Sequence, residues 1–296
     1  MSLVTLFIRG LGLSFRKRSL ALRLWAVNVL FSLLVIAPLA IVIHGQPPRS
    51  LSAANTLARP DIHWLTDLST QYMNTAPLLT GLLLAAVVLY LVLSVFLNGG
   101  VIGGLNRLEA RTTLADFFHD CGLFFWRFFR LFLLSLPFYL LFVGVLHSLV
   151  AALLKYLTRR SATEWPVLVA SNLRLLALVL LLGLVSMFFD YVKIGLATGG
   201  RRSVLKEAWR TLKFIARRFF RAWGLYLLAG LAFVALTLLY LEVIRIMPKN
   251  TPLWVLLVFL WQQLYILGRQ MSKVLFFATE LEFAKEIETR PALSDK

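Results

Sequence analysis

The chain has 296 residues, of which 59% are hydrophobic and only 15% are charged. Ordinary soluble domains are about half apolar and about a quarter charged, and a single soluble core stops growing near this chain length. The formal net charge of +17 would suit nucleic acid, but the basic residues flank apolar stretches instead of forming a patch on a polar domain. Composition therefore excludes an ordinary soluble protein. It favours a membrane protein whose basic residues meet anionic lipid headgroups.

Six apolar segments are long enough to cross a bilayer as helices, because a helical span needs about 20 mostly apolar residues. They cover roughly residues 20–43, 77–97, 131–154, 171–194, 223–244 and 253–275. The first segment follows basic residues as a signal peptide would, but its apolar run is long enough to span, so we expect a retained anchor. Residues 1–296 are predicted to form one transmembrane domain.

The distribution of basic residues predicts the orientation of the spans. Of the 31 Lys and Arg residues, 23 lie on the side that holds both termini and eight lie on the other side. By the positive-inside rule, the N-terminus and the C-terminus are both expected in the cytoplasm. The chain then has a periplasmic loop at residues 45–76, expected as a short interfacial helix or alternatively as a lid, and a cytoplasmic tail at residues 278–296.

Proline and glycine mark two kinds of special position in these spans. Pro38 and Pro137 lie inside the first and third spans, where proline kinks a helix, so both are candidate hinges. Two GxxxG spacings at the end of the second span involve Gly99, Gly100, Gly103 and Gly104. Such spacing predicts close helix packing, and phosphate binding by these glycines is the less favoured alternative.

The sequence after the second span matches the sequence after the fourth at an offset of 91 residues. Leu114 and Arg127 correspond to Leu205 and Arg218, and both segments lead into an apolar span flanked by arginine. A weaker match places Leu6 at the position of Leu205. Self-similarity at a fixed spacing indicates structural repeats.

We therefore expect three tandem repeats, at approximately residues 1–98, 99–196 and 197–280. Each repeat consists of a cytoplasmic amphipathic helix, a span outward, a loop and a span back, so all three insert with the same topology. Thr113 and Asp116 are expected to form a capping box at the start of the second amphipathic helix. The predicted fold is thus all-α, with six transmembrane helices in three two-span repeats and cytoplasmic amphipathic helices.

The three-repeat layout is similar in architecture to that of mitochondrial carriers. The carrier signature is absent, because neither Pro38 nor Pro137 is followed two positions later by an acidic residue. The chain also resembles six-span bacterial inner-membrane proteins. It shares with them the glycine-rich end of the second span, the Phe-Phe-x-Arg-Phe-Phe-Arg segment at residues 124–130, and the Asp-Tyr-x-Lys sequence that begins at Asp190. This resemblance covers most of the chain and implies a multi-pass protein of the inner membrane, but no chemistry.

Polar residues occupy equivalent positions near the ends of the even-numbered spans. Asn98, Asp190 and Gln270 correspond to one another, as do Lys193 and Lys273. Polar groups at membrane depth face protein or water, so these five residues are candidates for a polar ring that lines a vestibule or gate. The favoured interpretation is local, however: Asp190 pairs with Lys193 one helical turn away, and the two amides cap or hydrogen-bond nearby backbone.

Residues 201–221 form the clearest basic amphipathic helix, with apolar residues such as Leu205 and Ile215 at helical spacing. Seven basic residues are candidates for contact with lipid headgroups or with a protein partner: Arg202, Lys206, Arg210, Lys213, Arg217, Arg218 and Arg221. A helix that lies in the membrane interface is the favoured interpretation, and a docking surface for a cytoplasmic protein is the alternative.

The sequence contains no pattern that favours catalysis. The four histidines are scattered without metal-ligand spacing, and neither a nucleophile elbow nor a P-loop is present. We expect no enzymatic activity, cofactor, metal ion or nucleic-acid partner. The predicted function is a transporter, or a membrane subunit of a transport complex, for lipid or another amphiphile. The alternative is a membrane scaffold or assembly factor that presents basic helices to a partner.

Overall fold

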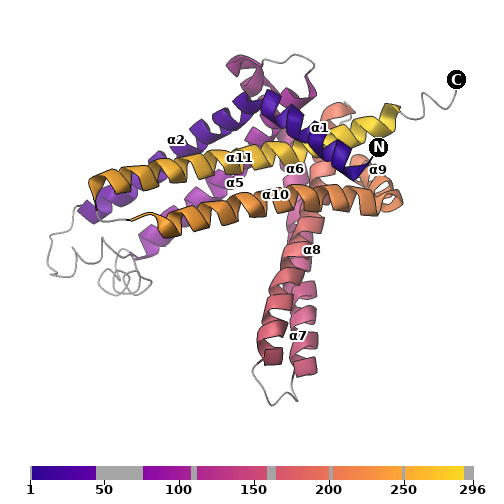
Figure 1. Cartoon of the computed structure of the whole chain (residues 1–296). Coiled ribbons are helices and arrows are strands. Elements are labelled where there is room, and N and C mark those ends of the chain that lie inside the picture. Colours follow the sequence, from indigo (N-terminus) through magenta and orange to yellow (C-terminus); the bar gives the residue numbers. More distant parts are fainter. Residues whose placement is uncertain are drawn as a thin grey trace. The chain divides into compact units, whose positions relative to one another are not determined.

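A computed structural model describes residues 2–44, 76–107, 112–158, 165–199, 203–248 and 251–289. This part of the chain is helical and contains no strand (Figure 1). Its helices are α1 (Leu3–Arg16), α2 (Arg18–His44), α5 (Ala76–Asn106), α6 (Leu114–Leu140), the π-helical turn η1 (Leu141–Leu146), α7 (His147–Thr158), α8 (Trp165–Thr198), α9 (Val204–Arg217), α10 (Phe219–Ile246) and α11 (Pro252–Thr289).

Six helical segments in the described residues are long and apolar enough to cross a membrane. They lie in α2, in α5, in the continuous run from α6 to α7, and in α8, α10 and α11, at the six predicted positions. The predicted all-α, multi-pass membrane class is therefore confirmed. The predicted periplasmic loop at 45–76 lies outside the described residues except for Ala76, where α5 begins.

The chain forms two compact units, one of residues 1–23 with 95–296 and one of residues 24–94. The second unit holds most of α2 and the first part of α5, with the rings of Phe31 and Tyr90 5.5 Å apart. The first unit holds α1, the last part of α5 and all later helices. The features described below belong to this first unit.

Two short helices are each followed at once by a long apolar helix. Ser2 caps α1, because its hydroxyl accepts the N–H of Thr5 at 3.2 Å. Lys17 then interrupts the helix before α2, and Arg218 interrupts the chain in the same way between α9 and α10. Both short helices have 14 residues, and their cap positions, Ser2 and Ser203, are offset by 201 residues. The sequence match of Leu6 with Leu205 gives an offset that is two residues smaller. The helix boundaries therefore align α1 with α9 differently from the side-chain types.

Helix α6 begins with the predicted capping box, which is confirmed. The Thr113 hydroxyl accepts the backbone N–H of Asp116 at 3.1 Å, and the Asp116 carboxylate accepts the N–H of Thr113 at 3.0 Å. Two N–H groups that the helix itself leaves unbonded are thereby satisfied. Unlike α1 and α9, α6 continues without a break into the apolar span.

Substituting Thr113→Ala should lower the free energy of unfolding by about 1 kcal/mol, since the cap bond is lost. Ser203→Ala is the matched control, because Ser203 holds the same position before α9 without a side-chain cap bond. Thermal unfolding of the full chain in detergent micelles compares the two variants. Equal shifts would contradict a stabilising role for the capping box.

Pro137 lies within α6, and the helix widens just after it. Proline has no N–H to donate, which loosens the helical hydrogen-bond ladder. The N–H of Leu141 reaches both the Phe138 and Pro137 carbonyls, and the π-helical turn begins at this residue. Pro38 lies within α2. A hinge at either proline stays a prediction.

The four glycines at the end of α5 lie against neighbouring atoms. A Cβ on Gly99 would lie 3.0 Å from the backbone oxygen of Asp120, and one on Gly100 would lie 2.5 Å from the Cys121 sulfur. Added Cβ atoms on Gly103 and Gly104 would meet Asp120 and Leu20, respectively. The start of α6 thus packs closely on the end of α5, as the GxxxG spacings led us to expect.

One hydrophobic core of the first unit joins the short helices to the ends of the long ones. Its buried residues come from α1, α8, α9, α10 and α11: Leu6, Met187, Tyr191, Ile215, Ala222, Leu225 and Phe283. We call this region the helical cap. Residues 278–289, expected to belong to a tail, instead continue α11 into it. With 38 residues, α11 is about 57 Å long, well beyond a hydrocarbon core of about 30 Å.

Helix α1 packs against α11 beside the helical cap (Figure 1). Gly10 faces Thr279, where an added Cβ would lie 2.8 Å from the Thr279 Cα. Because that neighbour is backbone, only glycine allows this approach. The N-terminal and C-terminal helices of the chain are therefore in direct contact.

Candidate functional site

Charged side chains of α8 and α11 gather beside the helical cap. The Lys193 ammonium donates to the Asp190 carboxylate at 2.7 Å, and the two side chains are 21% and 16% exposed. The pair is the one that the local interpretation of the sequence predicted. The Lys193 nitrogen also lies 5.7 Å from the centre of the Phe277 ring, so the charged end of this side chain lies against α11.

Helix α11 adds two more charges to this pair. Lys273 and Glu280 are seven residues apart, which places them on one face of the helix. Each interacts electrostatically with both Asp190 and Lys193. Glu280 is only 1% exposed, and neither of its carboxyl oxygens has a hydrogen-bond partner. We call Asp190, Lys193, Lys273 and Glu280 the charged cluster.

Hydroxyl groups from three helices surround the charged cluster. The Tyr139 and Ser186 oxygens of α6 and α8 lie 3.1 Å apart, and Tyr226 of α10 lies near Ser186. Tyr191 is 3% exposed, and its hydroxyl has no hydrogen-bond partner. Both Tyr191 and Tyr226 interact electrostatically with Glu280. Four membrane-crossing segments thus supply polar groups to one buried region.

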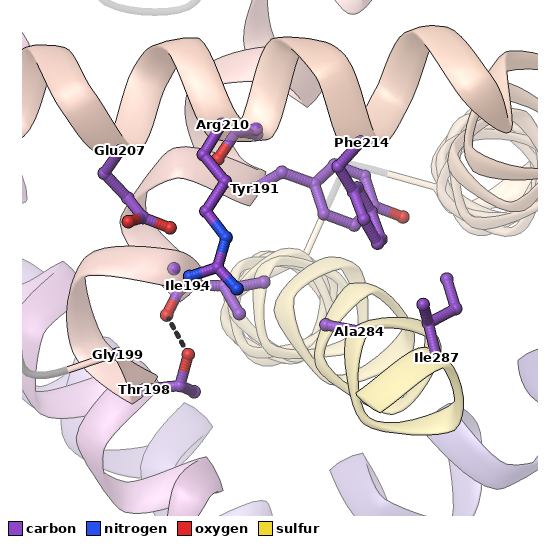
Figure 2. A pocket seen from close by; sticks show the side chains of 11 residues that line it. Tyr191, Ile194, Thr198, Gly199, Glu207, Arg210, Phe214, Ala284 and Ile287 are labelled. Carbon is purple, nitrogen blue, oxygen red and sulfur yellow. Dashed lines mark hydrogen bonds between the residues drawn. The ribbon is translucent and has the colours of Figure 1, made fainter. Parts of the chain in front are cut away.

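A cavity of about 280 Å³ lies between α8, α9 and α11 (Figure 2). Figure 2 shows the Arg210 side chain extending from α9 toward α8. Glu207 lies on the same wall, and its carboxylate fills the space that a Cβ on Gly195 would need. Tyr191 also lines the cavity, so this residue connects the cavity with the charged cluster.

The predicted polar ring is brought together only in part. Asp190, Lys193 and Lys273 lie in the charged cluster, as described above. Asn98 and Gln270 are also buried, but no hydrogen bond or ion pair in the described residues joins either amide to the cluster. A ring of three equivalent polar positions therefore stays a prediction, whereas the charges of α8 and α11 do meet.

The surface of α9 divides into three strips. Glu207, Thr211 and Ile215 are buried against the rest of the unit. The basic strip is exposed and consists of Lys206, Arg210, Lys213 and Arg217. The third strip is apolar and also exposed, and consists of Leu205, Trp209 and Leu212. The apolar residues of this helix thus do not form one buried face, because Ile215 points inward and the others outward.

Two further basic residues that were predicted to contact lipid headgroups or a partner follow directly after α9. Arg218 interrupts the chain before α10 and lies over the Phe214 ring at 5.8 Å, and Arg221 is exposed. Arg202 lies outside the described residues. On α9 itself, the Lys213 nitrogen lies 5.3 Å from the centre of the Trp209 ring. The basic and apolar strips of the helix therefore touch.

A second ionic group lies where α5 meets α6. The Arg107 guanidinium bonds to Asp120 at 2.9 and 3.1 Å and to Asp116 at 2.9 Å. The hydrogen bond and charge of Asp120, then those of Asp116, raise the pKa of Arg107 above its ordinary value. Lys17 donates to the Arg107 carbonyl at 3.3 Å. These contacts fix the junction, and none of them reaches the charged cluster.

The sequence interpretation missed Glu280 and the hydroxyl groups around it. Glu280 follows the predicted end of the sixth span, in the segment that was expected to be a cytoplasmic tail. A usable signal was present. The helical spacing of apolar residues continues past Leu275, because Ala278 and Leu281 follow Val274 at intervals of four and three residues. Tyr139, Ser186 and Tyr226 carried no such signal, because single hydroxyls inside apolar spans are common.

Comparison of the chain with protein-family models, with curated proteins and with solved structures found no match. Among the described residues, no group of three or more His, Cys, Asp or Glu side chains is placed to hold a metal ion. The charged cluster is instead suited to binding a charged group or to exchanging a proton, because it combines two carboxyl groups with two amines.

Proposed function

We propose that this protein is a transporter, or the membrane subunit of a transport complex, for a lipid or another amphiphile. The observation that carries the proposal is the buried charged cluster in helices that are otherwise apolar. Ionisable groups in membrane-crossing helices are costly to bury, and they commonly mark a pathway for substrate or ions. A chain whose spans served only as anchors would not need four such groups.

The surroundings of the charged cluster support an amphiphilic cargo. The adjoining cavity offers the Arg210 guanidinium and the Tyr191 hydroxyl to a polar headgroup. On the opposite side of α9 from the cavity, the exposed apolar strip offers a surface for an acyl chain. A naked ion would gain little from such an apolar surface, whereas an amphiphile has both a polar and an apolar part to bind.

The scaffold alternative is supported by a different observation, the exposed basic strip of α9. A basic helix that is not covered by its own chain is a plausible attachment surface for an acidic protein. This alternative predicts that the strip matters and that the charged cluster does not. The two proposals can therefore be separated by substitutions at two sites.

The test is the lipid and protein content of native membrane patches extracted with the tagged chain. The double variant Asp190→Asn, Lys193→Gln removes both charges of the buried pair together. Its matched control is Glu242→Gln, Arg245→Gln, which neutralises an exposed pair 3.9 Å apart on α10. We expect one lipid class to be enriched with the wild type and the control, and about tenfold less in the cluster variant, since charge-assisted contacts are lost.

Two outcomes would contradict the transport proposal. In one, no lipid is enriched with the wild-type chain. In the other, enrichment is unchanged in the cluster variant, while charge reversal at Lys206, Lys213 and Arg217 releases a stoichiometric protein. The second outcome would favour the scaffold alternative.

A further inference from the structure

Glu280 is an unusual group in this structure because its carboxyl is deeply buried without a hydrogen-bond donor. An ionised carboxylate in such a place loses the hydration that it has in water, which costs several kcal/mol unless a cation or donors replace it. Both oxygens lack such donors in this arrangement. The carboxyl is therefore suited to the neutral, protonated form here.

The nearby cations are in place but engaged elsewhere. Lys193, which interacts electrostatically with Glu280, donates to Asp190 at 2.7 Å. Lys273 lies two helical turns before Glu280 and interacts with Asp190 and Lys193. Asp190 and Glu280 thus compete for the Lys193 ammonium. Asp190 holds Lys193 in the conformation described.

We propose that Glu280 is a proton-binding site whose proton is exchanged when Lys193 moves between Asp190 and Glu280. In the protonated state, Lys193 pairs with Asp190, and Glu280 is a neutral acid. On release, the O–H bond of Glu280 breaks, the proton passes to water, and the remaining carboxylate takes Lys193 as its counterion. Lys273 then compensates the charge of Asp190.

The ionisable groups near the charged cluster come from three helices. Helix α8 contributes Asp190, Tyr191 and Lys193, α10 contributes Tyr226, and α11 contributes Lys273. Tyr191 both interacts with Glu280 and lines the cavity between α8, α9 and α11. Tyr191 therefore links Glu280 to the cavity, from which water can reach the carboxyl when this side chain moves.

This proton exchange would change the link between two membrane-crossing helices. Lys193 belongs to α8 and Glu280 to α11, so protonation decides whether the two helices share an ion pair. The inference goes beyond the transport proposal, since it holds whatever the cargo is. Its test also requires no transport assay.

The test is infrared spectroscopy of the full chain in lipid vesicles across a pH titration, following the carbonyl band of protonated carboxylic acids. We expect a band that persists at neutral pH in the wild type and in Glu242→Gln, an exposed-site control, and that is lost in Glu280→Gln. Asp190→Asn frees Lys193 for Glu280, so the band should disappear at a pH lower by about one unit or more. Lys193→Gln should shift that pH in the opposite direction.

Each of the two variants has its own predicted direction for the pH at which the band disappears. The proposal therefore stays testable if one of them fails to fold. Absence of a protonated-acid band in the wild type at neutral pH would overturn it. A neutral-pH band of unchanged intensity in Glu280→Gln would do the same. Shifts of the same sign in Asp190→Asn and Lys193→Gln would show that Lys193 is not shared between the two carboxyl groups.

Discussion

Replacing Phe283 with alanine is expected to lower the free energy of unfolding by about 3 to 5 kcal/mol, because the change leaves a cavity in the helical cap. Phe283 is fully buried. Its ring lies 6.2 Å from that of Tyr191 and 5.9 Å from that of Phe214, so truncation removes contacts with both α8 and α9. Equilibrium unfolding in mixed detergent micelles measures the effect.

Phe220→Ala is the matched control for this prediction, since Phe220 is 87% exposed. Its truncation creates no internal cavity and should change the free energy of unfolding by much less. The comparison also separates two views of residues 278–289. If they formed a solvated tail, the two substitutions would have similar small effects, and that result would contradict a structural role for the end of α11.

Gly10→Leu is expected to destabilise the protein by about 1 to 3 kcal/mol and to detach α1 from α11. The new side chain would meet the backbone of Thr279, which cannot move aside cheaply. Limited proteolysis would then cleave the chain within α1, and the thermal unfolding midpoint would fall.

Gly12→Leu provides a control of the opposite sign in the same helix. Nothing lies within 4 Å of a Cβ added at Gly12, so this change should stabilise α1 by up to about 0.8 kcal/mol through helix propensity alone. Equal destabilisation by both substitutions would contradict the contact between Gly10 and Thr279.

The spans and some local contacts could be predicted from the sequence because they depend on nearby residues. Apolar length is enough to locate the six membrane-crossing segments. A capping box needs only residues three apart, and Thr113 and Asp116 form it. The pairing of Asp190 with Lys193 likewise depends on one helical turn. In each case the physical cause is local, so no knowledge of packing was required.

The rest depended on which surfaces meet, which the sequence does not state. Lipid and protein both accept apolar side chains, so the periodicity of α9 could not show that Ile215 is buried while Leu205 and Trp209 are exposed. The same ambiguity concealed Glu280. An acidic residue after an apolar span suggests solvent, and only the neighbouring helices of the cap bury it.

The contact between α1 and α11 also has a consequence for the order of folding. Helix α9 packs on the preceding α8, and the start of α6 packs on the preceding α5, so these contacts form between neighbours in the chain. Helix α1 has its partner at the opposite end of the chain. Among the described helices α1 is synthesised before the others, whereas α10 and α11, on which it packs, are synthesised after them. The contact between α1 and α11 therefore forms only after the helices between them have been synthesised.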